Sequence, residues 1–166
     1  MVDATFLGWV CFCVNLPGKR DEIMSLMEWD GTYSIGIKEL DDHHQHLFML
    51  INRAFDGYNR GMGDAAVKKL LDELLEYATY HFSAEEMRMG EDAYPGIEEH
   101  YRQHKLFVNK VAELMELYKA VGSSILTSTL MFMNTWLTRH ILQHDREYAR
   151  YCLEQPTAPK RPTATA

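Results

Sequence analysis

The sequence predicts an all-α protein, folded as an antiparallel up-down-up-down four-helix bundle. Four long stretches carry apolar side chains at helical spacing, and glycine- or proline-containing breaks separate them. No stretch shows the period-two alternation of a half-buried strand. Because the breaks are short, consecutive helices are expected to be antiparallel neighbours.

The first two helices are expected over about residues 38–58 and 65–89, where apolar residues recur every three or four positions. The break between them reads NRGMGD. Gly61 and Gly63 are stop signals, and Asp64 is the expected N-cap of the second helix.

The third and fourth helices are expected over about residues 96–120 and 125–153. The turn GEDAYPG precedes the third, with Pro95 suited to a helix start. Gly122 and the two serines after it form the next break. The third helix carries Val108 among its inward apolar residues.

The bundle domain is expected over residues 28–153, between an N-terminal extension (1–27) and a disordered, Pro/Thr/Ala-rich tail (154–166). The extension contains ATFLGWVCFCV, which is apolar but shorter than the roughly 20 residues of a membrane helix. It also lacks the features of a secretory signal. We expect no membrane association and a translation start at Met24 or Met27; the alternative is an extension that contacts a membrane or a partner.

The charge and cysteine content narrow the function classes. A formal net charge of −7 argues against a nucleic-acid-binding surface, which requires a basic stripe. Three cysteines are too few for a disulfide framework. They favour a reducing compartment, and we expect a cytoplasmic protein.

All four predicted helices carry histidine on their buried stripe. Residues at i and i+4 lie one turn apart on the same helix face, so they can serve one centre. An unpaired imidazole or carboxylate in the core costs a few kcal/mol, and a bound metal removes that cost. These converging residues therefore predict a metal centre in the core; they are His44, His81, Glu85, His100, His104 and His140.

The donor set favours two metals. With Asp145 there are five imidazoles and two carboxylates, too many for one tetrahedral zinc. Two metals bridged by both carboxylates would have three and two histidines, which leaves one open position on the second. Asp145 follows His140 by five residues, about 140° around an ordinary helix. It can point inward only at an angle or through a local distortion of the helix.

Four stretches resemble the hemerythrin family in its bacterial single-domain form: MEWDGTYSIGIKELDDHHQHLF, YHFSAEEM, YPGIEEHYRQH and WLTRHILQHD. The resemblance implies two non-haem iron ions, with His100, His104 and His140 on the six-coordinate iron. His44 and His81 would hold the five-coordinate iron. Glu85 and Asp145 would bridge the two, with an oxo or hydroxo bridge beside them.

The resemblance further implies reversible, end-on binding of dioxygen at the five-coordinate iron. Apolar residues one turn from the ligands are expected to line the oxygen pocket: Leu47, Phe48, Leu137 and Ile141. The remaining histidines, His43, His46 and His144, are expected at the surface or behind the ligands. His43 stands where the family usually has glutamine.

The leading interpretation is an oxygen-binding protein rather than an enzyme, for storage of dioxygen or its delivery to an oxygen-consuming enzyme. The alternatives are a di-iron oxidase, a peroxidase-like or nitric-oxide-handling enzyme, and an oxygen sensor. Di-iron oxidases use Glu-rich sites with paired Glu-x-x-His motifs. Here the residue three before His100 is Ile97, which favours binding over oxidation.

Overall fold

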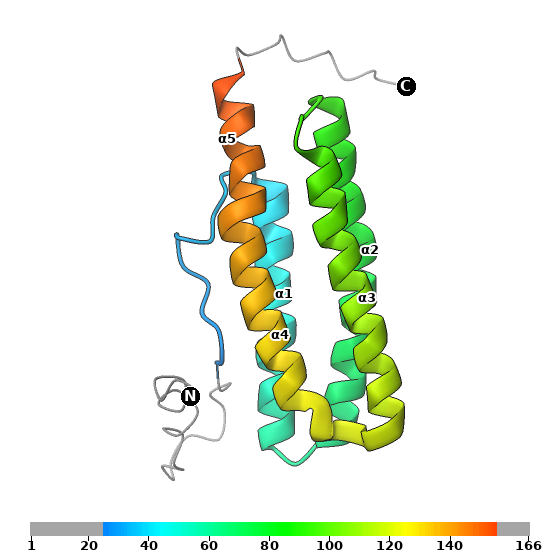
Figure 1. Ribbon diagram of the computed structural model, residues 1–166. Helices are drawn as coiled ribbons and strands as arrows, with labels where there is room; N and C mark the ends of the chain where they lie inside the picture. The colour runs from blue at the N-terminus through cyan, green and yellow to red at the C-terminus, as the bar shows by residue number, and fades with distance from the viewer. Residues whose placement is uncertain (1–24, 156–166) are drawn as a thin grey trace, which may run out of the picture.

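The computed structural model describes residues 25–155 of the 166-residue chain (Figure 1). Within that part the chain is helical without a strand, and it folds as the expected four-helix bundle. The expectations for residues 1–24, including a start at Met24, and for the tail from residue 156 lie outside the described residues.

Three of the four helices are unbroken: α1 (Lys38–Asn59), α2 (Gly63–Glu91) and α3 (Ile97–Val121). The fourth consists of α4 (Leu126–Arg139), a π-helix (His140–Asp145) and α5 (Arg146–Glu154) in one continuous rod. A 3₁₀ turn (Gly122–Ile125) joins it to α3. Successive helices run in opposite directions, so the antiparallel arrangement is confirmed (Figure 1).

The break between α1 and α2 follows the expected glycines. Gly61 has φ +84°, a left-handed conformation that glycine adopts without a steric penalty. The N-cap prediction for Asp64 is wrong, because α2 begins at Gly63, two residues before the expected start, and Asp64 lies in its first turn. Its carboxylate instead accepts a hydrogen bond from the Tyr118 hydroxyl at 2.9 Å, which ties α2 to α3.

The apolar stripes of the helices meet in one core. Val108 is an exception: it is exposed, although its spacing predicted an inward side chain. None of the helices within residues 25–155 combines the length and apolar character needed to cross a bilayer. The largest fully buried aliphatic side chains are Leu40, Leu47, Ile51, Leu70, Leu71, Leu74, Met89, Met133 and Leu137.

The segment before α1, residues 25–37, packs along the bundle without regular structure (Figure 1). The Asn52 side chain accepts a hydrogen bond from the N–H of Met27 at 2.9 Å and donates one to its carbonyl at 2.7 Å. Asp41, in the first turn of α1, accepts the Ile35 N–H at 2.8 Å. These contacts fix the entry into α1, the helix that carries His44.

Candidate metal centre

The seven histidine and carboxylate residues predicted to form a metal centre come together in the middle of the bundle. Each is at most 2 % exposed, although together they carry two carboxylates and five imidazoles. They project from α1, α2, α3 and the π-helix of the fourth rod; in chain order they are His44, His81, Glu85, His100, His104, His140 and Asp145.

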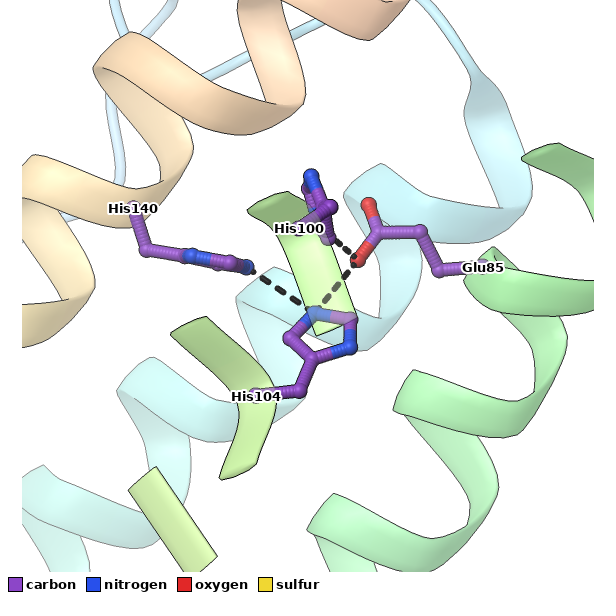
Figure 2. A group of neighbouring side chains, drawn as sticks. All are labelled: Glu85, His100, His104 and His140. Carbon is purple, nitrogen blue, oxygen red and sulfur yellow. Dashed lines mark hydrogen bonds and ion pairs between the residues drawn. The ribbon is translucent and has the colours of Figure 1, made fainter. Parts of the chain in front are cut away.

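Three imidazoles gather around one oxygen of Glu85 (Figure 2). Glu85 Oε2 lies 3.1 Å from Nε2 of His100 and 3.1 Å from Nε2 of His104. The Nε2 atom of His104 is in turn 3.1 Å from Nε2 of His140. One ligand atom from each of these four residues falls within 4.8 Å of the others, close enough to surround a single ion.

A second group shares Glu85 with the first. Ligand atoms of His44, His81 and Glu85 also lie within 4.8 Å of one another. Glu85 Oε2 is 3.8 Å from Nε2 of His81. The structure therefore divides the imidazoles into a group of three and a group of two, with one carboxylate common to both.

Asp145 lies between the same two groups. Its Oδ2 is 3.1 Å from Nε2 of His44, whereas its Oδ1 is 3.1 Å from Nε2 of His140 and 3.4 Å from Nε2 of His100. The π-helix explains how it points inward, because a wider turn brings residues five apart onto one side. Of the two possibilities that the sequence left open for Asp145, the structure shows the local distortion of the helix.

Several polar atoms of the cluster have no hydrogen-bond partner, although they are fully buried. Among them are Glu85 Oε1 and both oxygens of Asp145. Nε2 of His44 lies 3.1 Å from Oδ2 of Asp145 but is not aligned for a hydrogen bond. Both ring nitrogens of His44 and Nδ1 of His140 are also without partners. Such atoms are costly in a core unless something binds them. Converging imidazole and carboxylate atoms are a donor set that transition-metal cations satisfy, so the residues fit a metal centre.

The pKa values of the cluster are shifted in both directions: neighbouring carboxylates outweigh burial and raise the pKa of His44 and His100, and burial raises the pKa of Asp145. Burial holds the pKa values of His81 and His140 well below the ordinary histidine value. Burial alone would raise the pKa of Glu85, but the imidazoles around its carboxylate, His100 foremost, hold that pKa well below its usual value. Neutral imidazole and ionised carboxylate are the protonation states that bind metals.

Two contacts lie behind the ligand atoms. Glu86 Oε1 accepts a hydrogen bond from Nδ1 of His104 at 2.8 Å, which directs Nε2 of that ring at the cluster. Nδ1 of His43 lies 3.4 Å from Nδ1 of His81, so His43 is behind a predicted ligand. Sequence reasoning missed Glu86. Its position directly after Glu85 in YHFSAEEM was the available signal.

The other two histidines stand outside both groups. His46 and His144 are half-buried. The ring of His144 lies 5.6 Å from that of His140, centroid to centroid, and belongs to neither set of clustered ligand atoms. The ring centroid of His46 lies 6.4 Å from that of Tyr80.

Aromatic rings cover three of the imidazoles. Phe82 stacks on His104 with ring centroids 3.7 Å apart, Trp136 stacks on His140 at 4.2 Å, and Tyr77 stacks on His81 at 4.8 Å. These contacts hold the imidazole planes in place and exclude water. The four residues predicted to line an oxygen pocket are all buried: Leu47, Phe48, Leu137 and Ile141.

Comparison with known proteins identifies the family. The family model for the hemerythrin HHE cation binding domain matches residues 35–152, more than half of the chain. The chain belongs to the hemerythrin family. The resemblance of its four quoted stretches is thereby confirmed. The match begins just before α1 and ends two residues before the end of α5, so it includes nearly the whole bundle.

Relatives within the hemerythrin family come from different organisms. The chain is 32% identical over 126 residues to a bacteriohemerythrin of Stenotrophomonas maltophilia, covering 76% of this chain and 81% of the relative. It is 33% identical over 126 residues to a hemerythrin-like protein of Naegleria gruberi, with 76% and 93% covered. A crystal structure of a hemerythrin mutant superposes with a TM-score of 0.65 at 28% identity, covering 80% of this chain and all of that one.

Proposed function

We propose that this protein binds dioxygen reversibly at a non-haem di-iron centre, for storage or delivery of oxygen. The observation that supports this most directly is the division of the imidazoles into three and two around shared carboxylates. In this proposal His100, His104 and His140 hold one iron, and His44 and His81 hold the other. Glu85 and Asp145, which lie between the two groups, would hold both ions.

The unequal division provides the binding position. Two ferrous ions supply the electrons that reversible dioxygen binding needs. An ion held by His44 and His81 would have one protein nitrogen fewer than its neighbour, which would leave room for an exogenous ligand. Glu86 fixes the tautomer of His104, since its carboxylate accepts the Nδ1 proton.

The residues around the proposed metal centre favour reversible ligand binding over catalysis. Leu47, Phe48, Leu137 and Ile141 would line the pocket and keep water and protons from the bound ligand. A set rich in imidazole also differs from the Glu-rich centres of di-iron oxidases. We therefore propose a binding protein rather than an enzyme. The absence of a cysteine framework supports a cytoplasmic location.

Cycling the iron-loaded protein between air and argon tests this function. Anaerobic, reduced protein is loaded with ferrous iron and followed in the visible range. We expect two irons per chain and a charge-transfer band that appears in air and disappears under argon over repeated cycles. A one-way conversion to ferric protein would replace this proposal with the oxidase alternative.

A further inference from the structure

His43 lies behind one imidazole of the metal centre. The Nε2 atom of His81 faces Glu85, whose Oε2 is 3.8 Å away. The Nδ1 atom of the same ring lies 3.4 Å from Nδ1 of His43, and the two rings meet edge-on with centroids 5.5 Å apart. His43 therefore contacts the nitrogen of His81 that does not face the shared carboxylate.

Metal binding at Nε2 of His81 decides the direction of this hydrogen bond. An imidazole that binds a metal through one nitrogen carries its proton on the other, so Nδ1 of His81 is the donor. Nδ1 of His43 must then be the acceptor, with the proton of its own ring on Nε2. His43 is half-buried and lines a surface hollow with Glu39 and Arg88, where solvent can reach that second nitrogen.

His104 provides the internal comparison, from the group of three imidazoles. Its Nδ1 lies 2.8 Å from a carboxylate oxygen of Glu86, whereas Nδ1 of His81 faces a neutral ring at 3.4 Å. A hydrogen bond to a charged acceptor is shorter and roughly twice as strong as one between neutral groups. A stronger acceptor on Nδ1 makes the opposite nitrogen a better electron donor to a metal. The two groups therefore contain imidazoles of unequal donor strength.

We propose that His43 accepts the Nδ1 proton of His81 and thereby makes His81 a weaker electron donor to its metal than His104. The inference rests on the metal centre of the proposed function, though not on oxygen binding. His43 is a positioning residue, because it acts through His81 and belongs to neither set of clustered ligand atoms. The site with fewer imidazoles is thus also the more electron-poor one, which favours an electron-rich exogenous ligand there.

Zinc binding to the full chain tests this role, because Zn²⁺ takes imidazole ligands and has no redox chemistry. Three variants grade the acceptor: His43→Leu removes it, His43→Gln offers an amide oxygen, and His43→Glu offers a carboxylate. Imidazole ¹H–¹⁵N spectra of the zinc-loaded protein report the Nδ1 proton of His81. We expect its resonance to move downfield in the order His43→Leu, His43→Gln, His43→Glu, with the parent close to His43→Gln.

Competition with a chelator measures the affinity for the second zinc ion, which the group of two imidazoles would hold. His43→Leu is expected to weaken it roughly three- to tenfold, the range for one neutral hydrogen bond. His43→Gln should stay within about twofold of the parent, and His43→Glu should bind the second ion more tightly. Glu86→Gln should instead weaken binding of the first ion, because Glu86 lies behind the group of three.

Substitutions of His46 are the matched controls. His46 is also a half-buried histidine of α1, and its ring approaches that of Tyr80 as the ring of His43 does, at 6.4 Å against 4.9 Å between centroids. It belongs to neither group of clustered ligand atoms. His46→Leu and His46→Glu make the same changes of size and charge without touching the hydrogen bond, so both should leave the zinc affinities and the His81 proton as in the parent.

Three results would overturn the acceptor role of His43. The first is a His81 proton and a zinc affinity that His43→Leu leaves unchanged, and the second is a loss in His43→Gln as large as in His43→Leu. The third is an equal effect of the matching His46 substitution. If His43→Leu does not fold, the comparison of His43→Glu with His43→Gln decides. Failure of the oxygen cycle alongside the expected order of variants would remove the proposed function and leave the role of His43 intact.

Discussion

Glu86→Gln is expected to weaken metal binding by roughly three- to tenfold without disturbing the fold. The Glu86 carboxylate accepts the Nδ1 proton of His104 at 2.8 Å, a charge-assisted hydrogen bond. Such a bond contributes about 1.5–3 kcal/mol, against about 0.5–1.5 kcal/mol for a neutral one. The Glu86 side chain is 30% exposed, so solvent screens this interaction. We therefore expect the substitution to cost about 0.7–1.4 kcal/mol in the free energy of metal binding.

Competition with a chelator of known affinity measures this loss at fixed pH and ionic strength. Glu113→Gln is the matched control, because its carboxylate pairs with Lys110 on the exposed face of α3, away from the cluster. If Glu86→Gln binds metal as tightly as the parent, the carboxylate does not orient His104. An equal loss in Glu113→Gln would mean that overall charge, and not the hydrogen bond, determines the affinity.

Three further perturbations examine the centre and its surroundings. Glu85→Ala removes the oxygen shared by both imidazole groups, so iron analysis should give fewer than two irons per chain; a full complement would refute the bridging role. Leu137→Tyr brings a proton donor into the proposed pocket and should speed autoxidation in air, whereas an unchanged rate would show that Leu137 does not line it. Chelation of the metal should lower the Tm in scanning calorimetry by roughly 5–11 °C, since a ligand at a hundred times its Kd stabilises by about 2.7 kcal/mol. An unchanged Tm would show that the metal does not bind the folded state preferentially.

The sequence predicted the helices and the inward direction of the histidines because both follow from short-range spacing. A side chain at helical spacing from buried neighbours faces the same core, as His44 and His81 do. Spacing also predicted Val108 inward, wrongly, because it sits at the margin of the α3 stripe, where neighbouring helices decide which side chains are covered. The N-cap prediction for Asp64 was wrong for a similar reason: its carboxylate accepts a hydrogen bond from Tyr118, which is distant in sequence.

Partners behind the ligands could not be predicted from spacing. The hydrogen bond between Glu86 and His104 joins two helices, and it depends on rotamers and on the distance between their axes. The stacking of Tyr77 on His81, by contrast, lies within one helix at i and i+4, where the spacing alone allows it. For Asp145, geometry required either an oblique approach or a distortion, and only the structure distinguishes them.

The π-helix from His140 to Asp145 has a consequence for how this stretch tolerates insertions and deletions. Changes of length usually accumulate in loops, where closing a slightly longer or shorter chain costs little. Removing one residue here would turn the rest of the helix by about 100° relative to what precedes it. Either the imidazole of His140 or the carboxylate of Asp145 would then leave the core, and Tyr148 would rotate together with α5. Three of the four intervening residues, Leu142, Gln143 and His144, can therefore exchange side chains far more freely than the stretch can change in length, and an alignment that opens a gap here separates residues that belong to one site.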